Sequence, residues 1–265
     1  MGIPKGKYIV EATFNTGPLA GVLKGSGKAN FGVDARAQTM ELTPAGGGSL
    51  PAQLRSGLVL YLPFDSDGRT SRERSQNRNV GKVYGAKHTP SGKVGGAYEL
   101  DGFDDFVECS DIDIDEEHTR AFWFKLNTLS QSNPYLFDTG DGNDNWVELF
   151  DHDDDGQFEI RAGAGEVTYV DGKREFTSTG QWYFVAATVD RSGQLTIYVD
   201  GDYDSDGSVT PDTPGTVRMG RFAGDTPEAG ESFFDGVMDE VMVFNRALSP
   251  KEIKQIYDSQ KSSLK

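Results

Sequence analysis

The segment "FDTGDGNDNWVELFD" brings short acidic and amide side chains next to a tryptophan. Carboxylates and amides hydrogen-bond to sugar hydroxyls, and an aromatic ring packs against the C–H face of a sugar. We therefore predict a carbohydrate-binding loop with five ligand-binding residues: Asp138, Asp141, Asp144, Asn145 and Trp146. One alternative stays open, in which Trp146 is a core residue of the strand "WVELF" and alternates there with Glu148.

The segment from Phe234 to Phe244 reads as a buried strand that carries two neighbouring carboxylates. Alternation sorts its apolar side chains into two rows, one with Val237, Val241 and Val243 and the other with Met238, Met242 and Phe244. Asp239 falls in the valine row and Glu240 in the methionine row. Because an unpaired buried carboxylate is unfavourable, we expect both to be hydrogen-bonded, ion-paired or bound to a metal ion.

No group of residues predicts catalysis. The segment "DIDIDEE", from Asp111 to Glu117, is similar to the E-x-D-x-E catalytic strand of sandwich-fold β-glucanases. Its first position is aspartate, however, and no aromatic cleft residues lie near it. The histidines His88, His118 and His152 have neither zinc-ligand nor catalytic-triad spacing. We therefore expect a protein that is not an enzyme.

Two further acidic segments, "DHDDDG" from Asp151 and "DYDSDG" from Asp202, match the opening of an EF-hand calcium loop. The twelfth positions are Ala162 and Thr213 instead of the glutamate that such a loop requires, which excludes an EF-hand. Either a less regular calcium loop or a solvated β-turn fits both segments, since aspartate and glycine favour turns.

The net charge of the 265-residue chain limits its partners. Lys+Arg number 26 and Asp+Glu 42, for a formal charge of −16. Phosphate groups would be repelled, so we expect no nucleic-acid partner and no anionic membrane surface. No apolar run is long enough for membrane insertion, and the start "MGIPKGKYIVEATF" shows no signal peptide. We expect an extracellular or particle-surface location, by an export route or viral origin that the sequence leaves open.

The elements that would hold these residues are almost all strands. Period-2 alternation in "LVLYLPF", "AFWFKL", "WYFVAATVD" and "QLTIYVDG", with short turns between, predicts an all-β fold. The length favours a two-sheet antiparallel jelly-roll sandwich. A short C-terminal helix follows, with Ser249 as N-cap, Pro250 at the first helical position and Glu252 completing a capping box. Cys109, the single cysteine, reads as a small buried residue.

The first fifty residues differ from the rest. "YIVEATF" alternates as a strand, but the segment has few large residues and ends in the linker-like "PAGGGSLPAQ". We predict a β-rich N-terminal arm or assembly segment over 1–50, a linker over 51–56, the sandwich over 57–260 and a tail over 261–265.

From about Gly57 to Tyr257 the chain resembles the laminin-G-like (LamG-type) domains of the concanavalin A-like lectin and glucanase sandwiches. The resemblance lies in four segments: "LVLYLPFDSDG", "KVGGAYELDGFDDFVEC", "QWYFVAATVDRSGQLTIYVDG" and "FDGVMDEVMVFNRALSPKEIKQIY". The family also has a glycine-rich loop after the first strand. The corresponding "ERSQNRNVG" keeps Asn77, Asn79 and Gly81 but replaces other glycines, which leaves the backbone of this loop open.

The resemblance implies a metal-binding role for the acidic pair in the last strand. In such sandwiches the first and last strands are neighbours, and many members hold a structural Ca²⁺ near that junction. We therefore expect Ca²⁺ as a cofactor, held by Asp65, Asn77 and Asp239 with nearby carbonyl oxygens. The alternative is that Asp239 accepts hydrogen bonds from backbone amides while Glu240 faces solvent.

The resemblance also implies a non-catalytic, calcium-stabilised module for carbohydrate binding or adhesion, with a glycan or glycoprotein surface as partner. A second hypothesis is a structural component of a virion or surface assembly. In that case residues 1–50 would anchor the chain to another subunit or a scaffold protein and display the sandwich.

Overall fold

A computed structural model describes residues 50–68, 70–72, 79–110, 112–131, 133–139, 145–151, 155–164, 168–210, 216–222 and 232–262. The chain divides into two compact units, Met1–Ser49 and Leu50–Lys265. The predicted N-terminal arm, except for Leu50, lies outside the described residues. Within the described residues, no helix is long and apolar enough to cross a membrane.

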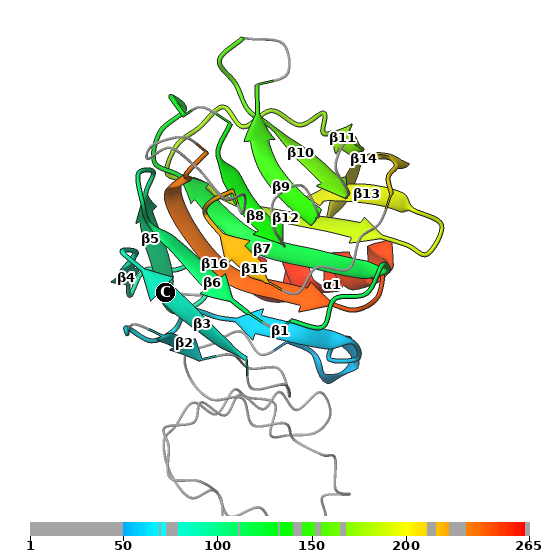
Figure 1. The fold of residues 1–265 in the computed structure, drawn as a ribbon, viewed down its shortest axis with the longest axis horizontal. Helices are drawn as coiled ribbons and strands as arrows, with labels where there is room; N and C mark the ends of the chain where they lie inside the picture. The colour runs from blue at the N-terminus through cyan, green and yellow to red at the C-terminus, as the bar shows by residue number, and fades with distance from the viewer. Residues whose placement is uncertain are drawn as a thin grey trace, which may run out of the picture. The chain divides into compact units, whose positions relative to one another are not determined.

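Two antiparallel sheets make up the unit Leu50–Lys265 (Figure 1). The first sheet contains β1 (Leu58–Leu62), β4 (Lys87–Thr89), β5 (Ala97–Asp101), β7 (His118–Leu126), β12 (Trp182–Val189), β13 (Gln194–Val199), β14 (Asp202–Ser208) and β16 (Asp235–Phe244). The second contains β2 (Thr70–Arg72), β3 (Val80–Tyr84), β6 (Phe106–Cys109), β8 (Tyr135–Thr139), β9 (Asn145–Phe150), β10 (Glu159–Ala164), β11 (Tyr169–Asp171) and β15 (Val217–Met219). The predicted two-sheet jelly-roll sandwich is confirmed.

The order of strands brings distant parts of the chain together. The first sheet runs β14-β13-β12-β7-β16-β5-β4, and β1 also pairs with β16, so the first and last strands are neighbours as expected (Figure 1). The second sheet runs β11-β10-β9-β8-β15-β6-β3-β2.

The core between the sheets is made by the inward-facing residues of both. Phe122 of β7 lies against Phe137 of β8, with ring centroids 6.3 Å apart, and both are buried. Cys109 is fully buried in the same cluster, as predicted. This apolar core fixes which face of each strand points outward.

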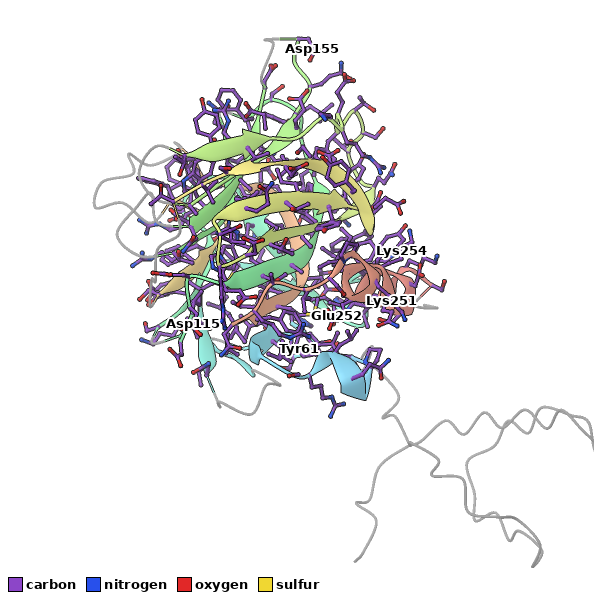
Figure 2. All side chains as sticks on the ribbon, turned by 90° about the vertical axis from the view of Figure 1, so that its right-hand side faces the viewer. Tyr61, Asp115, Asp155, Lys251, Glu252 and Lys254 are labelled. Carbon is purple, nitrogen blue, oxygen red and sulfur yellow. The ribbon has the colours of Figure 1, made fainter. Side chains whose placement is uncertain are left out.

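Helix α1 (Pro250–Lys261) covers the outer face of the first sheet. Its capping box is present: the Ser249 side chain accepts from the Glu252 amide, and the Glu252 side chain accepts from the Ser249 amide. Ile253 and Ile256 are fully buried in a second apolar cluster with Tyr61 of β1. Figure 2 shows Tyr61 below the helix that carries Glu252 and Lys254.

The predicted linker over 51–56 is packed structure instead. Ala52–Leu54 forms a 3₁₀ helix, and Leu54 is fully buried in the cluster under α1 together with Leu50. The two leucines supply apolar surface to this cluster, so the segment belongs to the sandwich.

The two apolar rows predicted for β16 are correct for Val241 with Val243 and for Met242 with Phe244, but wrong for Met238. The register against β7 shifts between Asp239 and Met242, and Glu240 has a positive φ of 53°. This bulge adds one residue to the strand and reverses the alternation. Met238 consequently lies in the inter-sheet core with Val241, whereas Met242 lies in the cluster under α1.

The segment "DYDSDG" is a strand rather than a calcium loop or a turn. It forms β14, the edge strand of the first sheet, paired with β13. The Asp204 carboxylate accepts hydrogen bonds from the backbone amides of Lys173 and Arg174. Acidic side chains on an edge strand discourage pairing with other chains, which accounts for this composition.

Candidate functional site

The outer face of the second sheet displays the residues most suited to binding. In β9 the inward-facing Val147 and Leu149 belong to the core, so Trp146 and Glu148 take the outer face. In β10 the same alternation turns Arg161 outward. None of these outward-facing side chains belongs to either apolar cluster.

Aromatic side chains form a band across this face, and we call the following set the aromatic band: Tyr84, Phe106, Tyr135, Trp146, Tyr169 and Phe222. Ring centroids are 6.2 Å apart for Trp146 and Tyr169, 5.9 Å for Trp146 and Tyr135, and 5.0 Å for Tyr135 and Phe222. The rings of Tyr84 and Phe106 stack at 4.3 Å. Five of these rings belong to β11, β9, β8, β6 and β3. The sixth, Phe222, lies after β15 and follows Gly220 and Arg221.

The rings of the band differ in how much surface they offer. Tyr169 is 48% exposed and Tyr84 is 40% exposed, whereas Trp146 is only 7% exposed. The Trp146 ring lies directly on Gly163, where a Cβ atom would come within 2.4 Å of it. Trp146 therefore supports its neighbours, and the two tyrosines present the accessible ring surface.

Ion pairs accompany the aromatic rings. The Arg161 guanidinium contacts Asp171 at 2.6 Å and Glu148 at 3.8 Å. It also lies over the rings of Phe150 and Tyr169, with 3.3 and 4.3 Å to the ring centroids. Such contacts hold the Tyr169 ring in place from one side.

Glu148 has unusual protonation behaviour for a carboxyl group. Burial raises its pKa to about 7, against opposing contributions from Arg161 and the Tyr135 hydroxyl. Burial likewise raises the pKa of Tyr135, and the neighbouring Glu148 charge raises it further. The face thus contains a carboxyl that changes charge near neutral pH.

Three of the five predicted ligand-binding residues, Asp138, Asn145 and Trp146, lie at this face but beneath its surface. Asp138 in β8 is fully buried, and its Oδ1 accepts from the Thr139 amide at 2.7 Å. Asn145 is 1% exposed, and its backbone N–H donates to the Thr139 hydroxyl. Asp141 and Asp144 lie outside the described residues. The assignment of these side chains to a ligand stays a prediction.

Sequence reasoning missed the two exposed rings of the aromatic band. Tyr84 and Tyr169 end or begin short strands, and only strand pairing places them on the same sheet as Trp146. The available signal was alternation: Tyr169 precedes the buried Val170, and Tyr84 follows the half-buried Val83 that packs against the core.

Two of the three residues predicted to hold Ca²⁺, Asp65 and Asp239, lie at one loop of the first sheet. Asp239 is fully buried, and its Oδ2 accepts from the Val94 amide at 2.9 Å. Asp65 Oδ1 accepts from the Gly96 amide at 3.4 Å, so both carboxylates contact residues 94–96. Asn77 lies outside the described residues. Both carboxylates thus accept from the same segment, and their binding of Ca²⁺ stays a prediction.

The fit of this loop to Ca²⁺ rests on its charge. Burial, and then the neighbouring Glu240 carboxyl, raise the pKa of Asp239 well above its usual range, and Asp65 adds to the effect. A cation beside Asp65 and Asp239 would offset this repulsion, and calcium takes six to eight oxygen ligands. Glu240 does not face solvent as the alternative had it, since it is fully buried and accepts from the Tyr61 hydroxyl at 2.6 Å.

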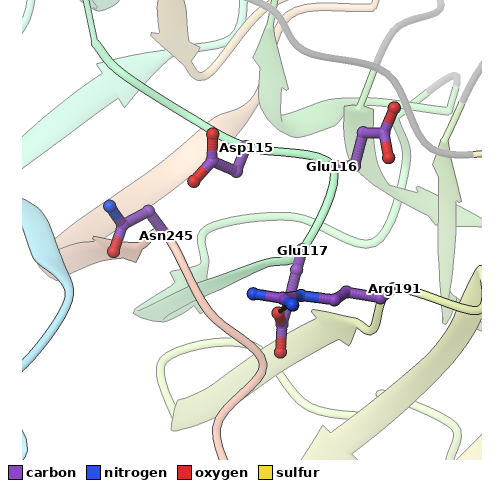
Figure 3. Close-up of a pocket in the computed structure, with 5 residues that line it drawn as sticks. All are labelled: Asp115, Glu116, Glu117, Arg191 and Asn245. Atoms are coloured by element: carbon purple, nitrogen blue, oxygen red, sulfur yellow. Dashed lines mark hydrogen bonds and ion pairs between the residues drawn. The ribbon is translucent and has the colours of Figure 1, made fainter.

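A second acidic group lines a pocket of about 420 Å³ (Figure 3). Its lining residues are Asp115, Glu116, Glu117, Arg191 and Asn245. Glu117 is already ion-paired with Arg191 at 2.7 Å. Residues 112–115 of "DIDIDEE" form no strand, so the alternate strand positions of a glucanase catalytic centre are not formed here.

Comparison with known proteins identifies sandwich domains. The family model of the concanavalin A-like lectin/glucanases superfamily matches residues 101–254, more than half of the chain. No curated protein sequence matches the chain.

Solved structures share the fold at low sequence identity. Domain 4 of AbnA, an extracellular arabinanase of Geobacillus stearothermophilus solved in complex with arabinotriose, is 19% identical with a TM-score of 0.60. The match covers 77% of this chain and 98% of that domain. The botulinum neurotoxin serotype D binding domain is 14% identical, with a TM-score of 0.60 over 78% of this chain. The match spans only 53% of that neurotoxin structure.

Proposed function

Because the chain belongs to the concanavalin A-like lectin/glucanases superfamily, we propose that it binds carbohydrate on the outer face of its second sheet. The observation that carries the proposal is the aromatic band, whose Tyr169 and Tyr84 expose ring surface on a polar face. Aromatic rings receive the C–H faces of sugars, and the ion-paired groups beside them offer donors and acceptors to hydroxyls.

The similar structures support the ligand class. Domain 4 of AbnA was solved with arabinotriose, and a botulinum neurotoxin DC binding domain was solved in complex with SialylT. Another neurotoxin structure is described by its interaction with two ganglioside molecules. The AbnA match covers 98% of a domain solved with a carbohydrate ligand, whereas the neurotoxin matches cover 53% and 52% of those chains and do not assign their glycans to the sandwich. We extend the ligand class, though no particular glycan, to this chain.

Binding without hydrolysis is the second part of the proposal. A glycosidase needs a proton donor and a second carboxylate on either side of the scissile bond. Glu148 holds a proton near pH 7, but it is 6% exposed and lies between Arg161 and Tyr135. This enclosure favours a structural role for Glu148. Reducing ends released from β-glucans by the wild type, and lost in Glu148→Gln, would show an enzyme instead.

Glycan-array screening followed by calorimetry tests the binding face. Tyr169→Ala and Tyr84→Ala should each weaken binding about tenfold, since losing a stacked ring removes roughly 1.5 kcal/mol of buried apolar contact. Tyr203→Ala is the matched control, because Tyr203 is 59% exposed but lies on the edge of the first sheet. Equal effects of all three substitutions would refute this location of the site.

Calcium stabilisation is proposed for the loop around Asp65 and Asp239. Supporting it are the shared contact of both carboxylates with residues 94–96 and the raised pKa of Asp239. The metal would neutralise the acidic pair, and its place away from the aromatic band gives it a structural role in the proposal.

A further inference from the structure

Arg221 lies at the aromatic band in a fixed position. Its guanidinium carbon is 4.8 Å from the centroid of the Phe106 ring and 5.7 Å from that of Phe233. Its Nε donates to the Phe222 carbonyl at 2.9 Å. Two rings and one carbonyl therefore hold the guanidinium beside Phe222, a member of the band.

The remaining donors of Arg221 have no acidic acceptor among the described residues. Arg161 and Arg218, on the same face, are ion-paired with Asp171 and Glu108. Glu108 is thereby already engaged by Arg218 at 2.9 Å. An arginine has five N–H donors in a planar fork, and Nε accounts for one of them. The Nη1 and Nη2 groups of Arg221 make no hydrogen bond or ion pair with a described residue.

The surroundings of Arg221 would favour an anion. Burial, and then the charge of Arg218, lower its pKa from the usual arginine range, while the charges of Glu108 and Asp138 partly oppose this change. Both effects disfavour the cation, and a negative group bound at the Nη atoms would offset both. A carboxylate or sulfate matches the planar fork of a guanidinium better than a neutral hydroxyl does.

We infer that Arg221 recognises an anionic substituent, a carboxylate or a sulfate, on the glycan that the aromatic band holds. The inference rests on the proposed function and adds the ligand's charge. Phe106 of β6, against which Arg221 lies, is three strand positions from Trp146 of β9. At about 4.8 Å between strands, this places the acidic unit roughly 14 Å from Trp146 along the band. The ligand is therefore an oligosaccharide with an acidic unit toward its Tyr84 end.

Matched pairs of oligosaccharides that differ only in charge test the inference. One pair is hexagalacturonate and its fully methyl-esterified form, and the other is sulfated and unmodified cellohexaose. The full-length chain should bind the acidic member of at least one pair roughly tenfold more tightly, because charge-assisted hydrogen bonds are the stronger kind. Raising the salt concentration should reduce this ratio.

Arg221→Gln should remove the preference for the acidic member while binding of the neutral member is retained. Arg221→Lys keeps the charge without the fork and should recover only part of the preference. Arg191→Gln removes an equal charge at an 89% exposed side chain in the pocket of Figure 3 and should change nothing.

Three results would overturn the inference. The first is equal or weaker binding of the acidic members, and the second is a preference that survives Arg221→Gln. If either result is found but Tyr169→Ala still weakens binding of the neutral members, the proposed function stands and only the charge assignment is refuted. The third result, no binding of any member, would remove support from both.

Discussion

Trp123 and Trp146 lie on the outer faces of the two sheets, and each packs against aromatic rings. Trp123 is 1% exposed, donates from Nε1 to Gln260 at 2.8 Å and stacks on Tyr257 at 5.6 Å, both in helix α1. Trp146 instead neighbours Tyr169, which is 48% exposed. One face is therefore closed by a helix, and the other presents aromatic surface.

A similar set of side chains thus serves two purposes, depending on what covers it. Each face combines aromatic rings with a cation over a ring and a buried carboxyl. The cation is Lys93 on the first sheet and Arg161 on the second. The buried carboxyl is Glu240 on the first sheet and Glu148 on the second. Under α1 these groups complete a second core, which stabilises the fold. On the second sheet they remain near the surface, where a ligand can take the place of the helix.

Truncation at the closed face should have the largest effect. Leu50 and Leu54 are buried under α1, so removing residues 1–56 should lower the free energy of unfolding by roughly 4 to 10 kcal/mol, at 2 to 5 for each leucine. Removing only 1–49 should change it by less than about 1 kcal/mol, because Leu50–Lys265 is a compact unit of its own.

Urea unfolding of the two truncated proteins measures this difference. If the protein that lacks only 1–49 were unfolded, the expected small stability change would be contradicted, and that segment would be part of the sandwich. Sedimentation of the full-length chain against the chain lacking 1–49 also tests the predicted assembly role of the N-terminal arm.

Substitution at the two faces should separate stability from binding. Trp123→Ala should cost about 3 to 5 kcal/mol of unfolding free energy, because it leaves a cavity and removes the partner of Gln260. Tyr169→Ala should cost less than about 1 kcal/mol and weaken glycan binding. Thermal unfolding and calorimetry together check both. A large stability loss in Tyr169→Ala would show that this face is a closed core as well.

Glu148, on the outer face of the second sheet, predicts a pH dependence of stability. The folded-state pKa of Glu148, about 7, exceeds its ordinary value of 4.5, so its contribution to stability is present below pH 4.5 and lost as pH rises through 7. Glu148→Gln avoids this loss. The stability of the variant relative to wild type should therefore rise between pH 4.5 and 8, by up to roughly 3 kcal/mol.

Thermal melts at several pH values test this, with Glu99→Gln as a control for losing an exposed carboxylate. If the stability of Glu148→Gln relative to wild type were constant over this pH range, the raised pKa of Glu148 would be contradicted.

Calcium binding should have the smallest effect on stability. Its proposed site lies beside the face that α1 covers. At ten times its dissociation constant, Ca²⁺ should stabilise the fold by about 1.4 kcal/mol, and excess chelator should reverse this. Asp65→Asn should abolish the response, whereas Asp67→Asn, an exposed change two residues on, should keep it. Melting curves unaffected by calcium in the wild type would remove the metal from the account.

Local sequence signals determined much of the sandwich. The hairpin between β12 and β13 and the capping box at Ser249 are as predicted, because turn residues and N-caps act within a few positions of the chain. The resemblance of four segments to one family indicated the fold before any strand pairing was known, and the family match confirms it.

The candidate site was only half visible in the sequence. Trp146 indicated the face that we propose for binding, since a tryptophan next to polar residues is a local pattern. Tyr84, Tyr169 and Arg221 are separated from it by tens of residues, and only strand pairing brings them together. The same limit hid the roles of Leu50 and Leu54, whose burial depends on a helix two hundred residues later.

The strands, the C-terminal helix and the family therefore follow from the sequence, because alternation and capping are short-range patterns. Tertiary structure decided which face each side chain takes. The bulge at Asp239 and Glu240 shows why: one extra residue in β16 moves Met238 to the core and Met242 to the helix, and alternation alone gives no sign of it. Only the pairing of β16 with β7 on one side and β1 and β5 on the other sets that register.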